Sequence, residues 1–98
     1  MSNWILQSAG EPPVVLRLMK GSVKTIGRTA KADFILDAPL VSRLHCRLTA
    51  DQSGQLVVED LDSQNGTFVN GRKVDRATLK AGDRLTVGRV EFAVDTAT

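Results

Sequence analysis

Short runs of β-branched and large apolar residues recur along the whole chain, separated by turn-forming residues at intervals of roughly eight to twelve positions. No segment sustains the period of an amphipathic helix, and the pattern is typical of an all-β sandwich or barrel. One stretch, residues 75–83, could hold a single helical turn, which Gly82 would end quickly. Strands are expected at residues 4–7, 13–19, 23–28, 34–37, 45–50, 55–60, 67–69, 83–87 and 90–94.

The last two expected strands show how such a fold buries its core. Leu85 and Val87 alternate with polar residues, and Phe92 and Val94 stand on either side of Ala93. Successive side chains of a strand point to opposite faces, so one face of this hairpin is expected to be buried and the other largely polar.

Two Asn-Gly pairs, at 65–66 and 70–71, are separated only by residues 67–69. Asn-Gly is the strongest short-range signal for a two-residue hairpin turn, because both residues tolerate the positive φ that such turns require. If both pairs closed hairpins, the strand between them would be at the short end of the usual range. The spacing therefore suggests that one pair serves another purpose.

Length and composition predict one globular domain spanning residues 1–98. The chain has 98 residues, of which 42% are hydrophobic and 24% charged, and this balance argues against disorder. A chain of this size can bury a single core, but it is too short for an additional substrate domain or lid. Most catalytic architectures need more residues.

The single cysteine, Cys46, cannot form a disulfide within the chain, and together with the single His45 it cannot complete a four-ligand zinc site. The apolar run at residues 4–6 is too short for the core of a signal peptide, and no stretch approaches a membrane span. These features indicate a reducing, cytoplasmic location.

Charge is divided unevenly between the two halves of the chain. Residues 1–50 contain 7 Lys or Arg and 3 Asp or Glu, whereas residues 51–98 contain 6 and 8, so the halves carry +4 and −2. This polarity would suit an anionic ligand held mainly by the first half, although scattered surface charge is the better explanation of the count taken alone.

A calcium loop is the first chemical hypothesis to test, because Asp60 and Asp62 have the opening spacing of an EF-hand loop. That loop needs glycine at its sixth position and a bidentate glutamate at its twelfth. Asn65 and Gly71 occupy these positions, so the hypothesis fails.

A nucleophilic site is the second hypothesis, because Ser42, His45 and Cys46 lie close together. No nucleophile-elbow motif surrounds Ser42, and Gln52 stands where a thiol phosphatase loop would carry an arginine. We expect His45 to be a structural hydrogen-bonding residue that braces its loop and Cys46 to be a small core residue.

Three expected loops carry side chains suited to an anion. A phosphate monoester attracts charge-assisted donors from several directions, and arginine presents a planar fork that matches it. Each loop alone is best explained as a solvated turn, but their combination in this order favours phosphate recognition. The candidates are Arg28 after Gly27, then Ser42 and Arg43, then Ser63, Gln64 and Asn65.

The same residues resemble the forkhead-associated (FHA) domain, a phosphothreonine-binding module. The similarity runs through "TIGR" at 25–28, "VSRLHC" at 41–46, "VVEDLDSQNGTFVNG" at 57–71 and "LKAGDRLTVG" at 79–88, and it is strongest over 23–94. The resemblance implies a sandwich of about eleven strands with the binding loops at one end and both termini at the other. It also implies a non-enzymatic reader of phosphothreonine proteins in kinase signalling, without a cofactor or metal.

The resemblance assigns roles to individual residues. Arg28 matches the position that contacts the phosphate, Ser42 the one that offers it a hydroxyl, and Arg43 one that often adds a contact. Asn65 matches the residue that hydrogen-bonds the peptide main chain beside the phosphothreonine. The positions that shape the loops are Gly27, His45 and Gly66.

The resemblance also explains the two Asn-Gly pairs, since the pair at 65–66 would form a recognition loop and the pair at 70–71 a tight turn. Gln64 departs from the family, because several relatives carry Thr near the phosphate at this position and others a basic residue. Its longer amide side chain leaves this contact open and predicts a modestly weaker phosphate affinity.

Leu40 and Val41 stand at the position where, in the family, the residue three places after the phosphothreonine is usually recognised. They predict a preference for an apolar over an acidic side chain at that place in the peptide.

Two other classes of function stay open at this point. The first is a protein-interaction module of the same fold that binds without phosphate. The second is a nucleic-acid binder, suggested by a pI of about 9.0. Against the second, the aromatic residues number only four, and three of them lie in strand-like apolar runs rather than on a stacking platform.

Overall fold

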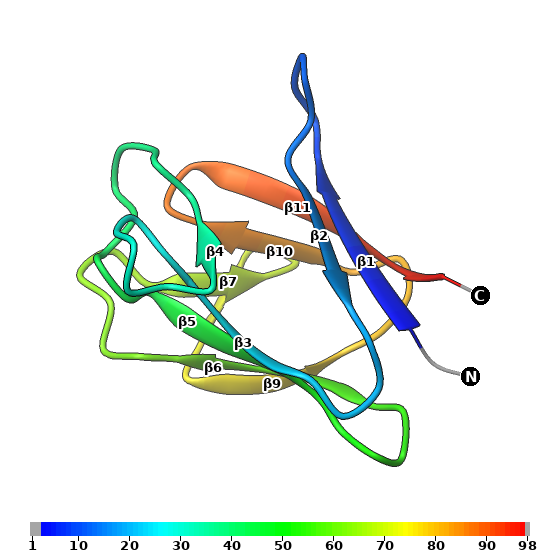
Figure 1. Cartoon of the computed structure of the whole chain (residues 1–98). Coiled ribbons are helices and arrows are strands. Elements are labelled where there is room, and N and C mark those ends of the chain that lie inside the picture. The colour runs from blue at the N-terminus through cyan, green and yellow to red at the C-terminus, as the bar shows by residue number, and fades with distance from the viewer. Residues whose placement is uncertain (1–2, 98) are drawn as a thin grey trace.

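The computed structural model describes residues 3–97 and shows two β-sheets packed face to face (Figure 1). Within these residues there are eleven strands and no helix, which confirms the predicted all-β sandwich. It follows that no helix in the described part of the chain could cross a membrane. The strands are β1 (Asn3–Ser8), β2 (Val15–Leu18), β3 (Val23–Gly27), β4 (Phe34–Ile35), β5 (Cys46–Ala50), β6 (Leu56–Asp60), β7 (Thr67–Val69), β8 (Arg72–Val74), β9 (Arg76–Leu79), β10 (Arg84–Val87) and β11 (Val90–Ala97).

The strand order is β2-β1-β11-β10-β7-β8 in one sheet and β4-β3-β5-β6-β9 in the other. Neighbouring strands are antiparallel except for β3 and β4, which run parallel. The longest pairing joins β1 to β11, from Asn3 opposite Ala97 to Ser8 opposite Phe92. The first and last described strands therefore lie side by side in the middle of one sheet.

The core lies between the sheets and is formed by alternate residues of the strands. In the last hairpin, Leu85, Val87, Phe92 and Val94 are all buried, as the alternating pattern predicted. Leu48 of β5 is also completely buried, between the two sheets. Burial of these side chains contributes most of the favourable free energy of folding, because apolar area is removed from water.

The predicted helical turn at 75–83 is wrong, because residues 76–79 form strand β9 on the open edge of β6. Ala77 and Leu79 point inward while Arg76 and Thr78 are exposed, which is the two-residue period of a strand. Strand β8 was not predicted as a strand, only as the segment following a turn. Residues 76–79 form a strand rather than a helical turn because pairing with β6 supplies them with backbone hydrogen bonds that an isolated helical turn would lack.

The Asn70–Gly71 pair closes a two-residue hairpin between β7 and β8, as predicted, since Val69 lies opposite Arg72. Both residues have positive φ, 52° and 81°, which matches the twist of a tight hairpin turn. The Asn70 side chain also bonds to its surroundings, because its Oδ1 accepts the Arg84 amide at 2.9 Å. This pair is structural.

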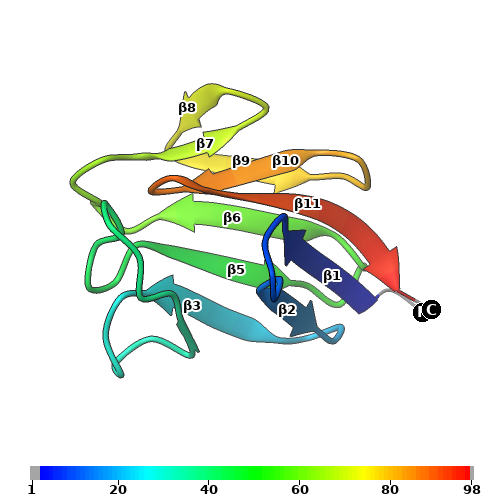
Figure 2. The same cartoon turned by 90° about the horizontal axis from the view of Figure 1, so that it is seen from above.

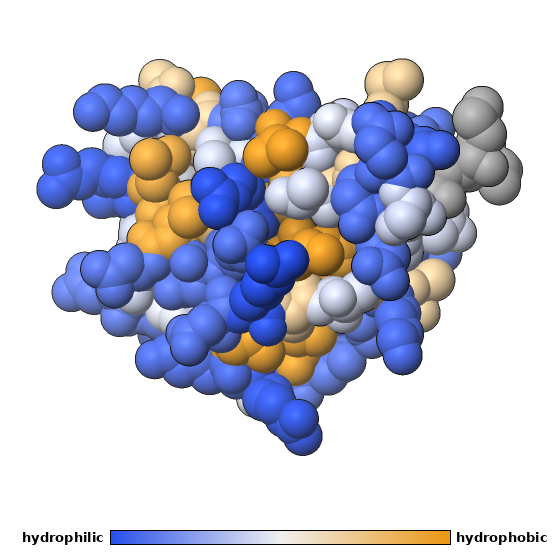
Figure 3. All heavy atoms as spheres, turned by 90° about the horizontal axis from the view of Figure 1, so that it is seen from below, coloured by the Kyte–Doolittle hydropathy of each residue, from blue (hydrophilic) through white to orange (hydrophobic). Residues whose placement is uncertain are grey.

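Three connections gather at one end of the sandwich: residues 28–33, 36–45 and 61–66 (Figure 2). The start of β1 and the end of β11 lie at the opposite end in the same view. The face of the molecule in Figure 3 is mostly hydrophilic, with hydrophobic side chains in separate small groups. Because the three connections gather at one end, polar groups that are far apart in the sequence come together there.

Candidate functional site

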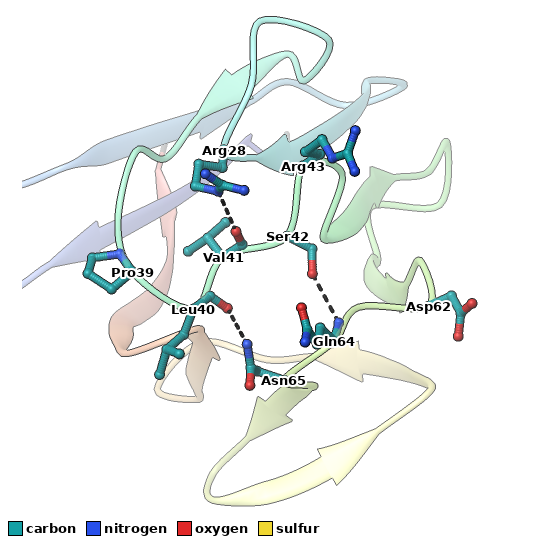
Figure 4. A pocket seen from close by; sticks show the side chains of 9 residues that line it. All are labelled: Arg28, Pro39, Leu40, Val41, Ser42, Arg43, Asp62, Gln64 and Asn65. Atoms are coloured by element: carbon teal, nitrogen blue, oxygen red, sulfur yellow. Dashed lines mark hydrogen bonds between the residues drawn. The ribbon is translucent and has the colours of Figure 1, made fainter.

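A pocket of about 560 Å³ opens between the loops at this end (Figure 4). All five residues predicted to contact a phosphothreonine peptide line it. The pocket also has an apolar wall, formed by residues 39–41, and one acidic residue, Asp62, and none of these was predicted to contact the phosphate. The lining is Arg28, Pro39, Leu40, Val41, Ser42, Arg43, Asp62, Gln64 and Asn65.

Arg28 follows the last residue of β3 and is fixed by two hydrogen bonds to the neighbouring loop. Its amide donates to the Ser42 carbonyl at 3.0 Å, and its side-chain Nε donates to the Val41 carbonyl at 3.0 Å. The side chain is exposed, and its two terminal nitrogens remain available. The guanidinium is therefore held in place through one nitrogen while its fork faces the pocket.

Ser42 connects the second loop to the third. Its Oγ accepts a hydrogen bond from the Gln64 amide at 3.0 Å. A hydroxyl that accepts one bond still has its own proton to donate. The position of the Ser42 oxygen is thus set by the protein, and its donor capacity is left for a ligand.

Asn65 makes the other bridge between these loops. Its Nδ2 donates to the Leu40 carbonyl at 3.2 Å, and Leu40 has a φ of 69°, in the left-handed region. A leucine in this region is strained, so the surrounding contacts must hold its backbone there. The Asn65 Oδ1 is left as an acceptor beside the pocket.

His45 is completely buried behind the pocket and braces both loops. Its Nδ1 lies 3.0 Å from the Ser42 amide nitrogen, and its Nε2 lies 2.8 Å from the Gly66 carbonyl oxygen. The amide can only donate and the carbonyl can only accept, so Nδ1 accepts and Nε2 carries the proton. The ring is therefore neutral and fixes the spacing between Ser42 and Gly66.

The two loop glycines occupy positions that a side chain would disturb. A Cβ on Gly27 would lie 2.0 Å from the Arg43 carbonyl oxygen, which is far inside contact distance. Gly66 has a φ of 91°, and a Cβ there would lie 3.1 Å from Lys73 and 3.2 Å from Phe68. Glycine allows the backbone to approach closely at the first position and to adopt positive φ at the second.

A polar network around Asp60 holds the third loop and was not recognised in the sequence. The Asp60 carboxylate accepts hydrogen bonds from the Ser63 amide at 3.1 Å, the Ser63 hydroxyl at 2.5 Å and the Thr67 hydroxyl at 2.7 Å. Burial acts to raise the pKa of Asp60, but these bonds outweigh it and hold the pKa below its usual value. The pairing of an aspartate with serine three residues later is the sequence signal that could have revealed this loop.

This network corrects one expectation. The Ser63 hydroxyl, taken from the sequence as an anion donor, donates to Asp60 and accepts the Gly66 amide at 3.0 Å. It therefore faces the inside of its own loop and has no proton left for a phosphate. Val41 also differs from expectation, because its side chain is only 3% exposed and belongs to the core. Of these two residues, only Leu40, at 42%, presents an apolar surface.

Arg43 and Asp62 lie at the margin of the pocket, where both side chains extend away from the ring formed by Arg28, Ser42 and Asn65 (Figure 4). Both are exposed. Arg43 is positioned through its backbone, since its carbonyl accepts the Thr29 hydroxyl at 3.4 Å. Two arginines against one aspartate give the lining a formal excess of one positive charge.

The cluster of Ser42, His45 and Cys46 does not have the geometry of a nucleophilic site. Nδ1 of His45 accepts the Ser42 amide, and its other nitrogen is bonded to a carbonyl, so neither is free to take a proton from a nucleophile. Burial raises the pKa of the Cys46 thiol to about 12, which keeps it protonated. Within residues 3–97, no group of three His, Cys, Asp or Glu side chains is arranged to hold a metal ion.

A sequence model of the FHA domain family matches residues 24–88, so the chain belongs to this family. It is 40% identical over 75 residues to the ABC transporter ATP-binding/permease protein Rv1747 of Mycobacterium tuberculosis, covering 76% of this chain and 8% of that protein. It is 36% identical over 72 residues to the glycogen accumulation regulator GarA of Mycolicibacterium smegmatis, covering 74% of this chain and 45% of GarA. The chain thus matches less than half the length of both relatives.

Solved FHA domains have the same architecture. The FHA domain of CT664 from Chlamydia trachomatis superimposes with a TM-score of 0.90 at 25% identity, covering 98% of this chain and 99% of the other. A structure from work on phosphothreonine-dependent FHA domain interactions gives 0.87 at 32% identity, covering 100% and 99%. Mycobacterium tuberculosis EmbR in complex with a low affinity phosphopeptide gives 0.87 at 26% identity, covering 100% of this chain and 25% of EmbR.

Proposed function

We propose that this domain recognises phosphothreonine in a partner protein and so mediates a phosphorylation-dependent protein interaction in Ser/Thr kinase signalling. One observation carries the proposal. Three side chains, those of Arg28, Ser42 and Asn65, each make one hydrogen bond within the protein that fixes their position. Each also keeps an unused donor or acceptor at the same pocket. Such a site is arranged before the ligand arrives, which lowers the entropic cost of binding.

The phosphate would lie between the first two loops. The two terminal nitrogens of Arg28 can donate to two phosphate oxygens, the geometry in which guanidinium groups bind phosphate most favourably. The Ser42 hydroxyl would donate to a further oxygen. The exposed side chains of Arg43 and Gln64 also line the pocket, and Arg43, which extends outward in Figure 4, would have to turn inward to add a contact. The positive lining complements a group that carries about −1.5 to −2 charges at neutral pH.

The peptide backbone would be held by the third loop. Asn65 donates to Leu40 through Nδ2, so its Oδ1 is the atom left to accept a peptide N–H next to the phosphothreonine. A hydrogen bond to the main chain fixes the direction of the peptide without selecting its sequence. The apolar side chain of Leu40, beside this bond, would then contact a residue further along the peptide.

The expected affinity is in the micromolar range. Each hydrogen bond to a charged group contributes roughly 1.5 to 3 kcal/mol, and three or four such bonds are offset in part by immobilising a flexible peptide. A net value of about −8 kcal/mol corresponds to a Kd of about 1 μM. This strength suits a contact that a phosphatase can reverse.

Recognition without catalysis is part of the proposal. The buried thiol of Cys46 and the fully bonded ring of His45 support it, because neither offers a nucleophile or a base to a ligand. We further propose that residues 1–98 form one FHA domain, that it needs no cofactor, and that it acts in the cytoplasm, where kinases have ATP. Nucleic acid and membrane are not among the proposed partners.

The direct test is a calorimetric titration with a degenerate phosphothreonine peptide pool, its unphosphorylated form and its phosphoserine form. Arg28→Ala removes the guanidinium, and Arg17→Ala serves as the matched control, because Arg17 is an exposed arginine on β2 outside the pocket. Saturable binding that requires phosphothreonine, survives Arg17→Ala and is lost in Arg28→Ala supports the proposal. Binding that ignores the phosphate would refute it.

The alternative is a phosphate-independent interaction module on the same fold. Among residues 3–97, six large apolar side chains are exposed over at least a third of their surface; of these, Ile35 at 57% directly precedes the second loop and Leu44 at 38% lies within it. If a partner bound through such residues, Arg28→Ala would leave its affinity largely unchanged. The same titration therefore separates the two functions.

A further inference from the structure

Asp62 is a carboxylate at the edge of a pocket that otherwise favours anions. It lines the pocket together with Arg28 and Arg43, and its side chain is exposed. Both ion pairs found among residues 3–97 involve other acidic residues, Glu59 and Glu91. The charge of Asp62 is therefore not neutralised by the protein.

The backbone of Asp62 holds this carboxylate in an unusual place. Its φ is 58°, in the left-handed region where glycine is most comfortable and aspartate is tolerated. The next residue, Ser63, is fixed to Asp60 by two hydrogen bonds, so the loop cannot relax easily around Asp62. The carboxylate is presented to the solvent at the margin of the pocket rather than folded back onto its own loop.

A negative charge here weakens attraction for phosphate, so its effect on binding must depend on what else the ligand carries. A phosphopeptide with a lysine or arginine beside the phosphothreonine would place a positive charge against Asp62 while its phosphate meets Arg28. Opposite charges arranged in this order give specificity rather than large affinity. An acidic side chain at the same position would be repelled.

We propose that Asp62 is a specificity-determining residue that selects phosphothreonine peptides with a basic side chain on the N-terminal side of the phosphothreonine. In Figure 4, Asp62 and Leu40 lie on opposite sides of Ser42, and the proposed function places the residues that follow the phosphothreonine beside Leu40. If residues after the phosphothreonine pass Leu40, those before it pass Asp62. This inference rests on the proposed function and deepens it by naming the chemistry of the partner.

The test uses a set of phosphothreonine peptides with alanine at the flanking positions, in which one lysine is moved through the three positions before and the three after the phosphothreonine. The measurement is the ratio of Kd between the alanine peptide and each lysine peptide. An exposed ion pair predicts a gain of about two- to fivefold at one or more preceding positions at low salt. The gain should shrink at high ionic strength.

Asp62→Asn keeps the shape of the side chain and tolerates positive φ, so the loop is preserved while the charge is removed. The lysine gain should fall to about one, and the alanine peptide should bind slightly more tightly because repulsion of the phosphate is lost. Asp95→Asn, at an exposed residue of β11 outside the pocket, is the matched control and should keep the gain. Asp62→Lys should reverse the preference, so that glutamate at the same position gains.

The outcomes separate the inference from the proposed function. If no peptide binds in a phosphate-dependent way, the proposed function is wrong and the role of Asp62 falls with it. If binding depends on phosphate but lysine gives the same ratios in wild type and Asp62→Asn, only the assignment of Asp62 is overturned. A gain confined to positions after the phosphothreonine overturns it as well.

Discussion

Replacing His45 with alanine is predicted to destabilise the domain and to uncouple the two binding loops. The ring is 0% exposed and bonds to the Ser42 amide and the Gly66 carbonyl at 3.0 and 2.8 Å. Its removal leaves one buried donor and one buried acceptor unsatisfied, at about 1–3 kcal/mol each. The space left by the ring adds to this cost.

The two unsatisfied groups alone sum to roughly 2–6 kcal/mol for His45→Ala, and the cavity adds to this loss. Natural domains have about 5–15 kcal/mol in total, so the variant should be marginally stable. For a domain of this size, each kcal/mol shifts Tm by about 4–8 °C, so a loss of roughly 2–6 kcal/mol lowers Tm by roughly 8–48 °C. Below that transition the variant should still fold but bind phosphopeptide at least tenfold more weakly, because Ser42 is no longer held against the third loop.

Urea denaturation followed by tryptophan fluorescence measures the stability change directly. Trp4 is the only tryptophan, is 7% exposed, and lies on β1, so its emission reports unfolding of the whole sandwich rather than of the loops. Leu44→Ala, at the exposed neighbouring residue, is the control and should cost less than about 0.5 kcal/mol. A loss below about 1 kcal/mol for His45→Ala would show that its two hydrogen bonds do not hold the loops.

Four further predictions concern single residues of the site. Gly27→Ala should lower stability by about 2 kcal/mol or more, because its Cβ would meet the Arg43 carbonyl at 2.0 Å, and an unchanged urea midpoint would contradict this. Asp60 has a lowered pKa when folded, so its ionised form stabilises the domain above the usual pKa of about 4, and this stability is lost as the pH falls through the folded value. The free-energy difference between wild type and Asp60→Asn should therefore narrow on acidification below about pH 4, and a difference independent of pH would refute the role of the ionised group. Gln64→Thr should tighten phosphopeptide binding about two- to threefold by offering a shorter hydroxyl donor, and weaker binding by calorimetry would count against it. In an oriented peptide library, Leu40 should favour apolar residues three positions after the phosphothreonine, and Leu40→Arg should shift the selection to acidic ones; selection of Asp or Glu by wild type would overturn this.

The strands could be predicted largely because their side chains alternate or form short apolar runs between turn residues. The prediction of a helical turn at residues 76–79 was wrong for a specific reason. Their alternation is only four residues long, and the partner that stabilises them, β6, lies almost twenty positions earlier in the chain. A short segment takes the structure that its neighbour allows, and local sequence does not encode that neighbour.

The resemblance to the FHA family predicted which residues meet at the pocket. It did not predict which of their atoms are already hydrogen-bonded or buried within the protein. Ser63 looks like an anion donor in the sequence, but its hydroxyl is occupied by Asp60. Val41 looks like part of a recognition surface, but it packs into the core. Both errors concern the direction of a side chain in a loop, which is set by hydrogen bonds and backbone angles that residue identity alone does not specify. The positive φ angles of Leu40 and Asp62 were likewise not predicted, because residue identity alone does not specify them.

The hydrogen bonds that fix Arg28, Ser42 and Asn65 have a consequence for the rate of recognition. No loop closure is needed before these groups can meet a ligand, so association should proceed at the rate of correctly oriented encounter, about 10⁵–10⁷ M⁻¹s⁻¹, aided by the positive lining. Differences between partners would then appear almost entirely in how long each complex lasts. At a Kd of about 1 μM these rates correspond to lifetimes of roughly 0.1 to 10 s, short enough for the domain to exchange partners as their phosphorylation changes.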